Sequence, residues 1–263
     1  MNKIRMPIDL AMTILSIMLM GGTYLFPADI VHEILGIALF LLWAVHITLN
    51  RRWYGAVFKG KYNPYRVMQT IINCGILVCV VFLMISGIIL SNHLFTFLNI
   101  QGGLGFARIT HLLASHWYYL FMSLHIGMHV EMIASKIRHP HASTNSHPDV
   151  SQTCHSDASQ PCHSDASQTC HSRAPTRESS ATKNTRSIPT KPLVTKILLA
   201  LICAYGLYAF IARGVWKYLI LHQEFFFFDL ERGYILFAID YISIIILFAT
   251  LSHLMAKSLK KNR

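Results

Sequence analysis

Six long apolar runs alternate with polar or basic stretches along the chain. A helix needs about 20 apolar residues to cross the hydrocarbon core of a bilayer, and each run is close to that length. The predicted spans are Ile8–Phe26, Ile30–Asn50, Val67–Leu90, Thr110–Ser135, Leu193–Ala212 and Tyr234–Ala256. The pattern therefore predicts an all-α integral membrane helix bundle of six transmembrane helices, in which a four-helix core precedes a C-terminal pair.

The first run has a second interpretation, because a basic start followed by an apolar stretch is also typical of a signal peptide. Asp9 interrupts the run, and no small-residue cleavage site precedes Pro27. Both features favour a helix that is retained.

The composition changes abruptly at Lys136–Pro192, which is rich in Ser, Thr, Pro and His and almost free of large apolar residues. Such a segment cannot bury enough apolar surface to fold, so we expect a disordered cytoplasmic linker between a four-helix domain at 1–135 and a two-helix segment at 193–263. The linker contains three octapeptides, SQTCHSDA, SQPCHSDA and SQTCHSRA. Their Cys-His pairs suggest metal binding, but the eight-residue spacing is not that of a zinc knuckle, and repeat expansion is the simpler interpretation.

Hydrophobic residues make up 53% of the chain and charged residues 13%, which excludes an ordinary soluble domain. The formal net charge of +11 does not indicate nucleic-acid binding, because Lys and Arg cluster between the apolar runs. With the N-terminus in the cytoplasm, the external segments keep only four of the 23 basic residues, which are Arg108, Arg213, Lys217 and Arg232. The positive-inside rule therefore predicts that both termini are cytoplasmic.

Four histidines at matched spacing distinguish the second and fourth spans. His32 and His46 are 14 residues apart, and so are His111 and His125. Both rings of each helix therefore project from nearly one face, with about 21 Å between them along the axis. In an up-down bundle these two spans run parallel, so we expect His32 beside His111 near the outer side and His46 beside His125 near the inner side. Two facing imidazoles at each level can ligate haem iron, and two levels predict a di-haem b-type cytochrome.

Two further histidines affect this assignment. His129 lies one turn beyond His125 and is an alternative ligand, although its spacing from His111 does not match the second span. His116 is rotated by about 140° from His111, so we do not expect it to ligate the same haem.

Other residues near the histidines have two interpretations each. Gly36 lies one turn after His32, where a missing side chain would let either a flat ring or another helix approach. Arg108, Arg51 and Arg52 lie where haem propionates would emerge, but also where basic side chains snorkel to the interface.

The stretches VHEILGIALFLLWAVHITLNRRW and FARITHLLASHWYYLFMSLHIGMH resemble the flavinylation-associated cytochrome family of prokaryotic membrane proteins. The resemblance covers roughly residues 5–135, and the Cys-His repeat departs from it as an insertion. It implies haem b in a bundle in the prokaryotic plasma membrane, and electron exchange with flavin-bearing partner domains outside the membrane. The matched positions are His32, His46, His111, His125 and His129.

Two other functions stay open on the sequence. A quinol-oxidising cytochrome b subunit would need a quinone pocket near one haem, for which the chain has no specific motif. A metal transporter or sensor is suggested by the 15 histidines and the Cys-His repeats. Carboxylates in or near the predicted spans are few, however, and comprise Asp9, Glu33, Glu131 and Asp240, to the last of which we assign no role. We find no nucleotide-binding glycine loop, nucleophile triad or flavin-attachment motif, so substrate chemistry is expected in a partner protein.

Overall fold

The computed structural model describes residues 2–21, 28–57, 62–100, 102–138, 190–222 and 233–261, and within these ranges the regular structure is entirely helical. The helices are α1 (Asn2–Met20), α2 (Asp29–Leu49), α3 (Arg51–Ala56), α4 (Pro64–Leu90), the 3-10 turn η2 (Thr96–Leu98), α5 (Leu104–Arg138), α6 (Thr190–Ala212), α7 (Val215–Leu219) and α8 (Gly233–Lys261). The all-α prediction is confirmed.

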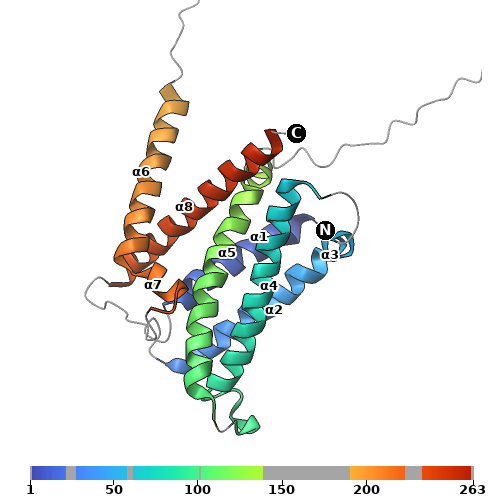
Figure 1. The fold of residues 1–263 in the computed structure, drawn as a ribbon, viewed down its shortest axis with the longest axis vertical. Helices are drawn as coiled ribbons and strands as arrows, with labels where there is room; N and C mark the ends of the chain where they lie inside the picture. The colour runs from blue at the N-terminus through green and yellow to red at the C-terminus, as the bar shows by residue number, and fades with distance from the viewer. Residues whose placement is uncertain are drawn as a thin grey trace, which may run out of the picture.

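The long helices are arranged up and down, so that α2, α5 and α8 run in one direction and α1, α4 and α6 in the other (Figure 1). Contacts between helix ends agree with this order. Ser91 Oγ, at the end of α4, donates a 2.7 Å hydrogen bond to Glu33 in the first turns of α2. At the opposite end of the bundle, Lys260 Nζ of α8 lies 3.7 Å from Glu131 of α5 and 4.8 Å from the ring centre of Tyr65 in α4.

Four helices of the described residues are long and apolar enough to cross a membrane: α2, α4, α6 from Leu193 and α8. Multi-pass membrane insertion is therefore plausible, but the predicted count of six is not established by apolarity. The two helices outside this set are α1, which contains Arg5 and Asp9, and α5. α5 contains four histidines, His111, His116, His125 and His129, which lower its hydropathy.

The helix bounds differ from the predicted spans mainly at the ends. α1 begins before Ile8 and ends at Met20, and α5 extends the fourth span at both ends, to 35 residues or about 52 Å. Short helices occur in the three connections 51–66, 91–109 and 213–233, as α3, η2 and α7. The predicted linker falls almost entirely outside the described residues, and at its edges α5 continues through Arg138 and α6 begins at Thr190.

α5 is the central helix of the bundle, lying between α4 and α8 (Figure 1). Its buried Tyr119 donates a 2.7 Å hydrogen bond to the Tyr241 carbonyl of α8, and Trp117 donates one of 3.1 Å to the Leu219 carbonyl of α7. Glycine allows the closest approach, because a Cβ at Gly127 would lie 2.1 Å from the Ala249 carbonyl oxygen. The C-terminal helices therefore cover one side of α5 and leave the side toward α2 and α4 for the histidines.

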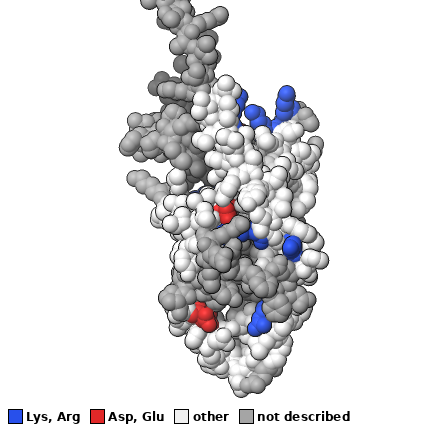
Figure 2. Space-filling view, turned by 90° about the vertical axis from the view of Figure 1, so that its left-hand side faces the viewer, with Lys and Arg blue, Asp and Glu red and all other residues white. Residues whose placement is uncertain are grey.

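Charged side chains are sparse on the face formed by the C-terminal helices. Figure 2 shows Lys and Arg at the upper end of this face and further Lys, Arg, Asp and Glu scattered lower down on a mostly uncharged surface. Lys260 lies at the end of the bundle where α4 begins and where α5 and α8 end. A mostly uncharged face of this kind is compatible with helices whose apolar sides contact lipid.

Candidate cofactor site

The structure brings together the histidines of α2 and α5 in two pairs. The ring centres of His32 and His111 are 6.3 Å apart, with an interplanar angle of 61°. Those of His46 and His125 are 6.4 Å apart, with an angle of 74°. Because the helices run parallel and the spacing is equal, each pair has one member from each helix at the same depth.

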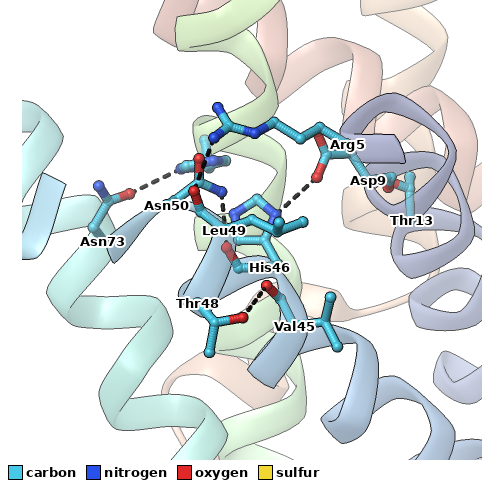
Figure 3. A network of polar contacts seen from close by, with 10 residues as sticks. Arg5, Asp9, Thr13, Val45, His46, Thr48, Leu49, Asn50 and Asn73 are labelled. Atoms are coloured by element: carbon cyan, nitrogen blue, oxygen red, sulfur yellow. Dashed lines mark hydrogen bonds and ion pairs between the residues drawn. The ribbon is translucent and has the colours of Figure 1, made fainter. Parts of the chain in front are cut away.

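Polar partners fix the ring nitrogens of the inner pair, which comprises His46 and His125 (Figure 3). His46 Nδ1 lies 2.8 Å from Asp9 Oδ1 of α1, and His125 Nδ1 lies 2.8 Å from Asn73 Oδ1 of α4. A carboxylate only accepts, and an amide oxygen only accepts, so both Nδ1 atoms must donate. In the neutral rings the lone pair is then on Nε2, which is the atom left to bind a metal.

In the outer pair, His32 and His111, the same donor and acceptor argument applies to His111, whose partner is Ser86. Ser86 Oγ donates its one hydrogen to the Phe82 carbonyl at 2.6 Å, so it accepts at its 3.0 Å contact with His111 Nδ1. His111 is thus also a donor at Nδ1, with its lone pair on Nε2. Such second partners are typical of histidines that ligate metals, because they fix the tautomer and the ring orientation.

The separations of the rings match those of two imidazoles bound to one metal ion. A metal–imidazole bond is about 2.0–2.1 Å long and a ring nitrogen lies roughly 1.1 Å from its ring centre, so two trans imidazoles have centres about 6.3 Å apart. Direct hydrogen bonding between the members of a pair does not explain the distance, because Nε2 of both inner histidines is an acceptor. The ring separations of both pairs are therefore compatible with a metal ion between the rings.

The surroundings of α2 are open near His32. This helix has no buried residue, although both of its histidines approach α5. A Cβ at Gly36, one turn after His32, would meet no atom within 4 Å. On the opposite side of the outer pair, a Cβ at Gly87 would lie 3.7 Å from the His111 ring. Of the two interpretations of Gly36, close packing against another helix is therefore wrong.

A basic residue that the sequence did not single out lies at the inner pair. Arg5 Nη2 donates a 2.8 Å hydrogen bond to the Leu49 carbonyl at the end of α2, and its Nε is buried without an acceptor among the described residues. Arg51 and Arg52 in α3, and Arg108 in α5, are exposed. Arg5 is therefore better placed than these three to hold an acidic group of a ligand, because a buried donor needs a partner.

The two remaining histidines of α5 differ in position. The His129 ring centre is 4.8 Å from that of His125, so it lies against the inner pair. His116 is buried on the side toward α7, where its Nδ1 lies 2.8 Å from the Leu112 carbonyl and its ring stacks on Tyr218 at 4.4 Å. His116 thus packs against the C-terminal part of the chain, away from the two pairs.

Asp240, to which the sequence assigns no role, is buried in the structure. Its side chain is 6% exposed, accepts a 2.7 Å hydrogen bond from Arg213 Nε and one of 2.6 Å from the Tyr205 hydroxyl. This burial arises because α6 and α8 pack together and enclose the carboxylate two turns inside α8. The ion pair could not be predicted from the sequence, because Arg213 directly follows α6 and Asp240 lies in α8.

Metal sites of the ordinary protein kind are absent from the residues that the structure describes, where no group of three or more His, Cys, Asp or Glu side chains converges. A haem iron needs only two protein ligands, because the porphyrin supplies the others. The Cys-His octapeptides of 151–174 lie outside the described residues. No family model matches the chain, and no curated protein or solved structure is significantly similar to it.

Proposed function

We propose that this chain is a membrane b-type cytochrome that holds two bis-histidine haems, one near each side of the bilayer. The observation that supports it best is the pair of ring separations, 6.3 and 6.4 Å, at two levels of parallel helices. His32 and His111 would ligate the outer iron, and His46 and His125 the inner one, with His129 as the alternative inner ligand. Haem bound there supplies one-electron redox chemistry at two depths in the membrane.

The proposal includes six transmembrane helices with both termini in the cytoplasm. α5 packs antiparallel to the apolar α4 along most of its length, so it crosses the membrane wherever α4 does (Figure 1). α1 is bound to the end of α2 by Arg5 and Asp9, which holds it beside a second apolar helix. Its polar residues then face α2 while exposed Ile4, Leu10 and Ile14 face lipid.

The protein's own side chains determine the geometry of this site. Asp9, Asn73 and Ser86 hold the Nδ1 hydrogens, which leaves Nε2 of each ring available for ligation. Glu33 fixes the start of α2 to the end of α4 by accepting from Ser91 Oγ and from the Asn92 and Leu94 amides at 2.7–3.0 Å. α2 is thereby held at a set distance from α5 although it buries none of its own residues.

The redox partners follow from what the chain lacks and from the family resemblance. No substrate-binding chemistry was found in the sequence, so we propose that electrons are exchanged with flavin-bearing domains outside a prokaryotic plasma membrane. A quinone is the alternative partner, and reduction of the purified protein by quinol would distinguish the two.

The proposal is tested by the optical spectrum of protein purified from cells that are supplied with haem. We expect a low-spin b-type spectrum, two haems per chain, and release of the haem by acidified organic solvent because it is not covalently attached. The matched control is His116→Ala, which removes a buried histidine outside the two pairs and should retain both haems. Absence of haem from the wild-type protein would overturn the proposal.

A further inference from the structure

The residues that accept hydrogen bonds from Nδ1 of the paired histidines differ in charge. His111 donates to the Ser86 hydroxyl and His125 to the Asn73 amide, both of which are neutral. His46 alone of these three donates to a carboxylate, Asp9 Oδ1, at 2.8 Å. Asp9 is the second residue of the apolar run that begins at Ile8, and an ionisable residue within such a run indicates a functional role.

A carboxylate that accepts a hydrogen bond from Nδ1 of a haem-ligating histidine changes the reduction potential of the iron that this histidine would bind. The charge-assisted hydrogen bond draws the Nδ1 hydrogen away and makes Nε2 a stronger donor, which stabilises the more positive, oxidised iron. Hydrogen bonding of this kind is one of the means by which a protein sets a haem potential. Asp9 is 53% exposed, so solvent weakens its long-range field, but the direct hydrogen bond is retained.

We propose that Asp9 is a positioning residue that lowers the reduction potential of the inner haem below that of the outer haem. This inference rests on the proposed function and extends it, because it makes the two sites unequal and places the more easily reduced one on the external side. Asp9 acts through His46 and does not itself ligate the iron.

A merely structural role for Asp9, as a tie between α1 and α2, makes a different prediction. Asp9→Asn keeps the size of the side chain and an Oδ1 acceptor for His46, so the tie persists while the charge is lost. A structural role predicts unchanged potentials in this variant, whereas a charge effect predicts a shift in one of them.

The experiment is a spectroscopic redox titration of the haem-loaded protein. We expect two components in the wild type, of which His46→Ala removes the lower one and thereby assigns it to the inner site. Asp9→Asn should change the ratio of oxidised to reduced inner haem at least tenfold at a fixed potential, an upward shift of about 59 mV for one electron. The upper component should stay in place, and Asp9→Glu should restore the low potential.

Thr13→Val is the matched control, since Thr13 lies one turn along α1 and its hydroxyl bonds only the backbone carbonyl of Asp9 at 2.8 Å. It should leave both potentials unchanged. An Asp9→Asn protein with both haems and an unmoved lower component would overturn the inference, as would a shift confined to the upper one. If Asp9→Asn lost the lower component, Asp9→Ser would be titrated in its place, because it offers a neutral hydroxyl like that of Ser86. Wild-type protein without haem would instead overturn the proposed function.

Discussion

At the scale of single residues, the pairing of the histidines is the most direct prediction. Because the ring centres of His32 and His111 are 6.3 Å apart, His32→Ala and His111→Ala should each remove or alter the same redox component. His46→Ala and His125→Ala should affect the other component and largely spare the first. A redox titration of the four single variants measures this, and loss of the same component by His32→Ala and His125→Ala would contradict the parallel arrangement of α2 and α5.

His129 is the alternative to His125 as the inner ligand, and the two assignments predict different results for His129→Ala. Its ring centre is 4.8 Å from that of His125, within one helical turn. With His125 as the ligand, His129→Ala should retain both haems and shift only the lower component. If His129→Ala lost the inner haem while His125→Ala kept it, the ligand assignment would move by one turn and the pairing of the helices would stand.

The buried ion pair between Asp240 and Arg213 leads to a prediction about stability. Removal of one member leaves an uncompensated charge, with Arg213 only 10% exposed, so Asp240→Leu should destabilise the folded protein by about 3–5 kcal/mol. The double variant Asp240→Leu with Arg213→Leu should recover most of the loss, because no charge is then left buried. Thermal unfolding in detergent compares the two, and equal losses in the single and double variants would show that the pair itself is needed.

At the scale of helices, close contact between α5 and α8 depends on the absence of a side chain at Gly127. A Cβ there would lie 2.1 Å from the Ala249 carbonyl oxygen, so Gly127→Ala must push the helices apart and should cost about 1–3 kcal/mol. Gly105→Ala in the same helix meets nothing within 4 Å and should be neutral or slightly stabilising. The difference between their unfolding temperatures is the measurement, and equal temperatures would argue against this packing.

The helices and the histidine positions could be predicted from the sequence because both depend on local periodicity. Apolar run length placed α2 within one residue at each end, and the 14-residue spacing put two rings on one face of each helix. The partners of the rings could not be predicted. Asp9 and Asn73 come from α1 and α4, and their contacts with His46 and His125 depend on how far each helix slides along its neighbour, which periodicity does not determine.

Arg5 shows the same limit from another direction. In the sequence it is one of two basic residues before an apolar run, and it contributes only to the expected orientation. The contact of its Nη2 with the Leu49 carbonyl, 44 residues away, requires the turn between α1 and α2 to bring the ends of both helices together. A hydrogen bond between two helix ends, such as that from Arg5 to Leu49, can therefore be predicted only once it is known which helix ends lie together.

At the scale of the whole molecule, the number of crossings decides on which side each histidine pair lies. The apolar character of four helices does not settle it, because α1 and α5 are not among them. If α5 crosses the membrane, segments on either side of it must lie in different compartments. A reporter inserted after Ile100 should then be external, and one inserted after Asp149 cytoplasmic.

Each crossing by α1, α6 and α8 likewise moves the chain to the other side of the membrane, so the positions of the two termini report whether the number of crossings is even. Six crossings place tags at Met1 and Arg263 on the same side, and the basic residues place that side in the cytoplasm, since 19 of the 23 Lys and Arg lie in segments assigned to it. A fluorescent protein that folds only in the cytoplasm should report at Arg263, and a phosphatase that is active only outside should report after His222. Tags on opposite sides would mean an odd number of crossings, with α1 lying along the surface. Asp9 would then not lie beside His46 within the membrane, and a difference between the two reduction potentials would need another cause.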